Sequence, residues 1–239
     1  MSVGDTVLDC KSCGAASTGK FCPNCGQSMT VKKLSFHELI HEVFHLFTHL
    51  DKGYPYTLKM LLLSPGKMQK QYVEGNRVKY QKPFSMFFIS ASVCALIFYW
   101  VNSALIKYYH LGDTKETAFF HQYWVLLQVC MLPLYCFISF LCFKKARYNF
   151  GEIVVSQLYT FSFIFLLLAL IQLFKFINPH LETRYIELPL IIGYSLATNL
   201  NFFSHLKRST IILISLITII LLFLIAVFVQ DKLVELIYA

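Results

Sequence analysis

Long stretches without a charged side chain dominate the pattern of hydrophobic and polar positions along this chain. Five windows of 19 residues or more contain no Asp, Glu, Lys or Arg: 83–106, 117–143, 153–174, 188–206 and 209–230. A helix needs about 20 mostly apolar residues to cross the hydrocarbon core, and lipid offers no hydrogen-bonding partner to an irregular backbone. The pattern predicts an all-α integral membrane protein with five transmembrane helices, at 84–106, 121–143, 153–175, 186–205 and 209–230.

A different periodicity precedes the first window. On a helix spanning 34–51, the apolar side chains fall within one arc of about 160°, and His37, His41, His45 and His49 fall on the opposite side. We interpret this segment as an amphipathic helix that lies on the inner leaflet or packs against the spans. Because histidine titrates near neutral pH, the histidine face is also a candidate pH-sensing surface.

The same histidines form two overlapping His-Glu-x-x-His patterns, which on a helix can supply two zinc ligands and a general base. A membrane zinc metalloprotease would use His37, Glu38 and His41. That hypothesis needs a sheltered cleft and a third ligand, and neither is evident in the sequence. A second metal on this face stays an alternative, whereas repetition of histidine on one polar face is the simpler explanation.

The formal net charge of +8 is distributed in a way that predicts the orientation of the spans. With five spans and a cytoplasmic amino terminus, the segments 1–82, 144–152 and 204–209 lie inside and hold 16 of the 21 Lys and Arg residues. This bias follows the positive-inside rule and predicts a cytoplasmic amino terminus with the carboxyl terminus outside. The fourth window is the most polar, but without it Lys207 and Arg208 would lie outside. Since topology accounts for the basic charge, no nucleic-acid partner is expected.

Four of the eight cysteines form two Cys-x2-Cys pairs near the amino terminus. The pairs are Cys10 with Cys13 and Cys22 with Cys25, and a glycine follows each pair. Two intervening residues let both thiolates reach one ion, and four thiolates suit a tetrahedral structural zinc. Disulfides are disfavoured in a reducing cytoplasm. The spacing predicts a zinc ribbon over 1–30 that binds one Zn²⁺, with no coordination position left open for catalysis.

The region between the ribbon and the first span, 31–82, is predicted to be helical and juxtamembrane. A short apolar helix ends at a turn over 64–66, and a second helical piece stops at 75–76. Basic residues then cluster before the first span: Lys67, Lys70, Arg77, Lys79 and Lys82. Their simplest role is to orient the chain during insertion. The alternative is contact with anionic lipid headgroups.

The transmembrane domain, 83–239, has no central charged residue in any span, so the sequence predicts no proton relay. Milder polar groups mark a candidate cluster in the third and fourth spans, namely Gln157, Ser195, Thr198 and Asn199. Hydrogen bonds between helices explain such residues most simply. A polar path for a lipid or small solute is the alternative.

Two stretches of the amino-terminal third carry a resemblance. They are Phe21-Cys22-Pro23-Asn24-Cys25-Gly26-Gln27 and the ordered series Asp51-Lys52-Gly53, Thr57-Leu58, Leu62, Pro65-Gly66, Tyr72, Gly75-Asn76-Arg77, Tyr80 and Pro83-Phe84. Over roughly residues 10–90 the chain resembles a family of uncharacterised bacterial membrane proteins, the domain of unknown function numbered 3667. The resemblance implies a zinc-ribbon head on a multi-span inner-membrane domain, and it implies no reaction. A fainter likeness is to the Yip membrane family, whose members act in membrane organisation and trafficking without catalysis.

These observations predict a non-enzymatic multi-pass membrane protein: an adaptor, sensor or assembly factor. Its expected partners are membrane lipids and either another protein or a second copy of itself. A transporter or channel subunit is the first alternative, and the metalloprotease is the second.

Overall fold

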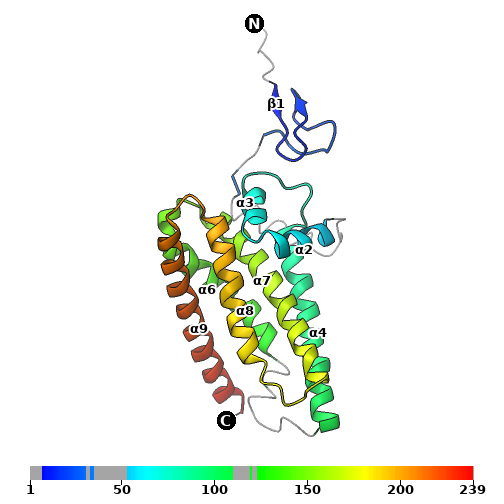
Figure 1. Ribbon diagram of the computed structural model, residues 1–239, viewed down its shortest axis with the longest axis vertical. Helices are drawn as coiled ribbons and strands as arrows, with labels where there is room; N and C mark the ends of the chain where they lie inside the picture. Colours follow the sequence, from blue (N-terminus) through cyan, green and yellow to red (C-terminus); the bar gives the residue numbers. More distant parts are fainter. Residues whose placement is uncertain (1–6, 31–32, 35–52, 110–118, 120–122, 239) are drawn as a thin grey trace.

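The computed structural model describes residues 7–30, 33–34, 53–109, 119 and 123–238. The predicted helix over 34–51, with its four histidines, lies almost entirely outside the described residues. Within the described part, three units follow one another along the chain. A small two-stranded ribbon comes first, a pair of short helices follows, and a bundle of five long helices completes the chain (Figure 1).

The five long helices run alternately up and down, so that each lies antiparallel to the next in sequence (Figure 1). Their bounds are α4 Pro83–Tyr109, α6 Trp124–Cys142, α7 Phe150–Leu173, α8 Arg184–Phe202 and α9 Arg208–Tyr238. Short 3-10 turns follow two of them, η1 Lys144–Ala146 and η2 Phe174–Phe176. A helix therefore occupies each of the five predicted windows.

Helix α7 is the centre of the bundle, because it packs against α4, α6 and α8. A capping box of Asn149 and Glu152 defines where α7 begins. The Asn149 side chain accepts a hydrogen bond from the Glu152 N–H at 2.8 Å, and the Glu152 carboxylate accepts one from the Asn149 N–H at 2.8 Å. Such a capping box satisfies backbone donors that the first helical turn leaves without a partner. Helix α9 packs on α6 and α8 and leaves most of its apolar surface exposed.

By length and composition, four of these helices can cross a membrane: Pro83–Tyr109, Trp124–Cys142, Phe150–Phe176 and Arg208–Ile237. The described residues contain no fifth helix that is apolar enough. Helix α8 has sufficient length, but Arg184, Glu187, Asn199 and Asn201 lower its hydropathy. The four helices support a membrane location, and the expected fifth span is not shown by composition alone.

The cap is the pair of short helices at the ribbon end of the bundle, α2 Tyr54–Leu63 and α3 Lys67–Val73. Ser64-Pro65-Gly66 separates the two helices. Both helices pack against α7, and α3 also packs against α8. The ribbon, drawn in blue, lies beyond the cap (Figure 1). Its strands β1 Leu8–Asp9 and β2 Ala16–Ser17 pair antiparallel.

Candidate metal centre and its attachment to the bundle

The four cysteines of the ribbon converge on one point. The Sγ atoms of Cys10, Cys13, Cys22 and Cys25 all lie within 4.8 Å of one another. Short separations of 3.5 Å join Cys10 to Cys25 and Cys13 to Cys22. Each short separation therefore joins the two Cys-x2-Cys pairs, so the cluster crosslinks the two halves of the ribbon.

The two halves have the same backbone geometry. The N–H of Gly14 donates to the Cys10 carbonyl at 2.8 Å, and the N–H of Gly26 donates to the Cys22 carbonyl at 2.9 Å. Gly14 has a φ of 75° and Gly26 a φ of 73°, in the left-handed region that favours glycine. Each glycine thus closes a tight turn that directs two sulfur atoms to the same side.

Backbone N–H groups within these turns favour the thiolate form. Hydrogen bonding from the N–H of Cys13 is the largest influence on Cys10 and lowers the pKa of that thiol to about 6. The N–H of Ala15 likewise lowers the pKa of Cys13. At Cys25 the N–H of Gln27 acts in the same direction, but burial and the neighbouring sulfur atoms outweigh it and raise the pKa to about 11. Four thiolates this close repel one another unless a cation lies between them.

The donor set fits zinc. A tetrahedral zinc with Zn–S bonds near 2.3 Å places its sulfur ligands about 3.8 Å apart, and the separations here run from 3.5 Å to at most 4.8 Å. Sulfur-only coordination also suits Zn²⁺ rather than calcium or magnesium. Four protein ligands complete a tetrahedron, so such an ion would hold the ribbon together without an open position for substrate.

The ribbon is fastened to the loop that follows α3. The Gln27 side-chain oxygen accepts hydrogen bonds from the N–H groups of Arg77 and Val78, both at 3.3 Å. The Lys11 ammonium donates to the Glu74 carbonyl at 2.9 Å. The backbone carbonyl of Gln27 also accepts from the N–H of Cys22 at 2.8 Å. One residue therefore both closes a cysteine turn and binds the loop, a role that the sequence pattern does not reveal.

The turn of the cap is held against α7 and α8. Asn201 donates to the Pro65 carbonyl at 2.8 Å, and Tyr194 donates to the Leu61 carbonyl at 3.2 Å. The buried Gln69 side chain accepts from the Gly66 N–H and donates to Thr160 Oγ1 at 3.2 Å. Three of these hydrogen bonds join a residue of the 61–69 segment to a long helix, so the cap and the bundle form one packed unit.

Gly66 makes the closest approach in this contact. An added Cβ would collide with the Thr198 carbonyl oxygen and would lie 2.7 Å from Asn201 Cβ and 2.8 Å from the Phe202 nitrogen. Gly66 also has a φ of 78°. Both the conformation and the space admit glycine alone.

A second contact holds the start of α2 to the loop before α4. Thr57 Oγ1 donates to the Gly53 carbonyl at 2.8 Å and accepts from the Gln81 N–H at 2.8 Å. The Tyr159 hydroxyl of α7 donates to the Gln81 carbonyl. The side chains of Thr57 and Tyr159 are buried. The loop over 74–82 is therefore hydrogen-bonded both to the ribbon and to the helices of the cap and the bundle.

Of the five basic residues predicted for lipid contact, two have partners within the protein and three have exposed side chains. Lys70 donates to Ser204 Oγ at 3.0 Å and lies 4.0 Å from the Glu74 carboxylate. The Arg77 guanidinium lies over the Tyr72 ring, 5.9 Å from its centroid. The side chains of Lys67, Lys79 and Lys82 are exposed.

The predicted polar cluster of the third and fourth spans is divided by the packing. Asn199 donates to Ser215 Oγ of α9 at 3.0 Å. Thr198 is fully buried, and Ser195 and Gln157 are half-buried. Gln157 lies on α7, and within the described residues no hydrogen bond joins it to the three residues of α8. The structure thus brings Asn199 to a neighbouring helix rather than to Gln157.

Comparison with known protein families gave one match. Residues 51–94 match the family described as "Protein of unknown function (DUF3667)". The match confirms the resemblance seen in the sequence and covers the cap, the loop after it and the first part of α4. Neither the curated proteins nor the solved structures contain a match. The matched segment includes Gly53, Thr57 and Gly66, whose contacts hold the cap in place.

Proposed function

We propose that this chain is a non-enzymatic, five-span protein of the bacterial inner membrane whose zinc ribbon is a docking head for a protein partner. The role is that of an adaptor, sensor or assembly factor. A closed four-cysteine site supports a structural metal rather than a catalytic one. Polar side chains of the long helices support the same conclusion, because Tyr194, Asn199 and Asn201 each hydrogen-bond to another element of the fold.

The attachment of the ribbon carries this proposal. Gln27 binds the loop over 74–78 next to the cysteine cluster, and Lys11 binds the same loop from the other cysteine pair. A ribbon that served only as a loose amino-terminal segment would need no such contacts. Phe21, on the ribbon, stays 66% exposed. The head therefore combines a fixed attachment with an accessible aromatic side chain, the residue type that often anchors protein interfaces.

The proposal counts α8 as the fifth span because three of its polar side chains hydrogen-bond inside the protein. Asn199 bonds to Ser215, Asn201 bonds to the Pro65 carbonyl, and Glu187 accepts from Gln172 at 2.9 Å. Polar groups bonded within a bundle do not have to face lipid. With five spans, the ribbon, the cap and the loops 144–149 and 203–207 share the cytoplasmic side, in keeping with the positive-inside rule.

A photoreactive amino acid in place of Phe21, in the full-length chain and in its native membrane, tests the docking role. We expect a discrete crosslinked protein from this position. Leu224 is the matched control, because it is exposed on α9 and would face lipid. The adduct from Phe21 should disappear when Cys22 is replaced by Ser, since the ribbon then loses a metal ligand. A chain that crosslinks no protein from Phe21, or does so equally in the Cys22→Ser background, would count against a docking head.

A further inference from the structure

Helix α2 exposes large apolar side chains, which a helix surrounded by water does not usually do. Its inner face buries Thr57 and Leu61 completely. Its outer face leaves Leu62 63% exposed, Leu63 64% exposed and Tyr56 42% exposed. A helix on the surface of a soluble domain places polar residues on its outer face. Large apolar side chains grouped on an exposed face instead indicate a contact with another apolar phase or partner.

The cap lies beside the long helices and not only above their ends. Thr160, which bonds Gln69, is ten residues from the start of α7, a distance of about 15 Å along the helix. Tyr194, which bonds the Leu61 carbonyl, is eight residues from the end of α8, or about 12 Å. The hydrocarbon core of a bilayer is about 30 Å thick. If α7 and α8 cross the bilayer, the turn of the cap reaches the depth of the cytoplasmic leaflet.

The apolar face of α2 is matched by an apolar surface on the first span. Phe88, Val93 and Leu96 of α4 are all exposed. Helix α4 begins at Pro83, directly after the loop that Thr57 binds. The Thr57–Gln81 hydrogen bond thus holds α2 to the loop that leads into α4, and the bilayer that surrounds α4 is the nearest apolar phase for α2.

Basic side chains accompany this apolar face. Lys59 is exposed on α2 itself, Lys67 begins α3, and Lys82 directly precedes α4. Within the described residues none of the three has a carboxylate partner within ion-pair distance. A lysine can lay its aliphatic stem along apolar surface and keep its ammonium group at the level of the lipid phosphates. The charge is complementary to anionic headgroups.

We propose that α2 is an interfacial helix whose Tyr56, Leu62 and Leu63 face lies in the cytoplasmic leaflet, with Lys59, Lys67 and Lys82 contacting the phosphates of anionic lipids. The cap is then a membrane-binding element and not part of a soluble head. This inference rests on the membrane placement of the bundle in the proposed function, and it is independent of the adaptor role. The docking head can fail its test while the lipid contact stands, and the reverse also holds.

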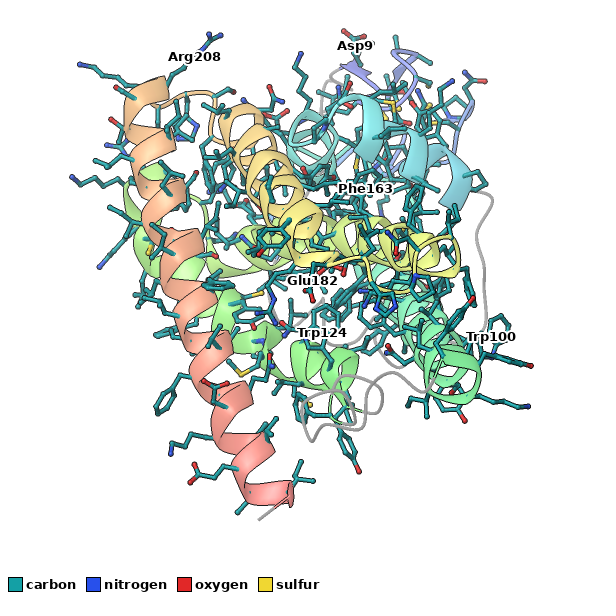
Figure 2. All side chains as sticks on the ribbon, turned by 60° about the horizontal axis from the view of Figure 1, so that its bottom comes forward. Asp9, Trp100, Trp124, Phe163, Glu182 and Arg208 are labelled. Atoms are coloured by element: carbon teal, nitrogen blue, oxygen red, sulfur yellow. The ribbon has the colours of Figure 1, made fainter. Side chains whose placement is uncertain are left out.

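Fluorescence quenching in the full-length protein tests the placement. The two native tryptophans, Trp100 and Trp124, lie toward the end of the molecule opposite Asp9 and Arg208 (Figure 2). Both would be replaced by Phe, and one new tryptophan added at Leu63 or, as the matched control, at the exposed Val78 of the loop bound to the ribbon. The chain would be reconstituted in phosphatidylcholine vesicles with 30% phosphatidylglycerol, a composition chosen for the test, with or without brominated acyl chains.

We expect brominated lipid to quench Leu63→Trp at least about twofold, because contact with the bromine atoms requires the side chain to lie among acyl chains. Aqueous iodide should quench it weakly, and Val78→Trp should show the reverse pattern. Leu62→Trp repeats the test on the same face in case one variant folds poorly. Strong iodide quenching of both Leu62→Trp and Leu63→Trp without quenching by brominated lipid would overturn the proposal, and would leave a protein partner as the occupant of this face.

The headgroup preference has its own readout. Two sets of vesicles would contain the same mole fraction of brominated lipid, carried either by phosphatidylglycerol or by phosphatidylcholine. Quenching of Leu63→Trp should be stronger with brominated phosphatidylglycerol. Replacing Lys59, Lys67 and Lys82 by Gln should bring the two values together. Lys232→Gln, at the far end of α9, is a control that removes one positive charge away from α2 and should leave the difference unchanged. Equal quenching by both lipids in the unsubstituted lysine background would overturn the anionic preference.

Discussion

Single residues in the matched family segment have specific structural roles. Gly53 is one example, since an added Cβ would lie 2.9 Å from the Gln81 nitrogen and 3.0 Å from the Lys79 carbonyl oxygen. Gln69 and Thr57 are fully buried, and each side chain both donates and accepts a hydrogen bond. Buried polar groups of this kind are costly to lose, because the partner left behind has no water to replace the bond. These residues fix how the cap sits on α7 and α8.

Gly66 offers the sharpest test at this scale. Gly66→Ala would place a methyl group against the Thr198 carbonyl and would strain a backbone with φ of 78°. We expect a loss of about 2 kcal/mol or more in the free energy of unfolding. The measurement is chemical unfolding of the purified chain in detergent micelles.

Gly193→Ala is the matched control for that experiment. Gly193 lies on α8, and an added Cβ would meet no atom within 4 Å. Alanine in a helix interior is favoured over glycine by about 0.5–1 kcal/mol, so this variant should be as stable as the parent or slightly more so. Equal stability of the two variants would show that the cap does not pack on α8 as described.

Among the elements, the ribbon depends most on a ligand. Two strands of two residues each bury very little apolar surface, and among residues 7–30 only Cys10, Ser12, Cys22 and Gln27 are buried. A ribbon of this size has almost no core, and metal binding then supplies most of its folding free energy. The helices of the bundle pack on one another and do not share that dependence.

Zinc content is therefore the measurement for this element. We expect one zinc per chain in the detergent-purified protein, and none when Cys10, Cys13, Cys22 and Cys25 are replaced by Ser. Far-ultraviolet circular dichroism should keep its helical signal in the variant, because the bundle does not contact the metal. A second zinc that survives the cysteine changes would place metal on the histidine face predicted for 34–51 and would revive the metalloprotease hypothesis.

For the molecule as a whole, the topology depends on whether α8 crosses the membrane. The bundle places α8 beside α7 and α9 and antiparallel to both (Figure 1). Glu187, Asn199 and Asn201 lower its hydropathy but bond within the protein, and polar groups bonded inside a bundle do not have to face lipid. An odd number of spans puts the ribbon and the end of α9 on opposite sides of the membrane, whereas four spans would put them on the same side.

Accessibility of two epitope tags decides between these topologies. One tag would precede the ribbon and the other would follow α9, each tested with protease in vesicles of known orientation. With five spans we expect only one tag to be cleaved in each orientation. Cleavage of both tags in inside-out vesicles and of neither in right-side-out vesicles would mean that α8 does not span.

The sequence by itself determined the membrane character of the chain, the positions of the long helices and the cysteine set. Each of these follows from a local pattern in the sequence. The patterns are charge-free windows of helical length, basic residues concentrated in the segments between them, and two residues between paired cysteines. The resemblance over the cap was also visible, although the reason for its glycines was not.

Tertiary structure alone decided what holds these parts together. Gln27, Gln69, Asn201 and Tyr194 look like ordinary polar or aromatic residues, because their partners lie about 50 to 136 residues away along the chain. Hydropathy averaged over a window also counts every polar side chain as if it faced lipid, and it leaves out the bonds that Asn199 and Asn201 of α8 make within the protein. Long-range hydrogen bonds arise only when distant segments meet, and no local pattern in the sequence records them.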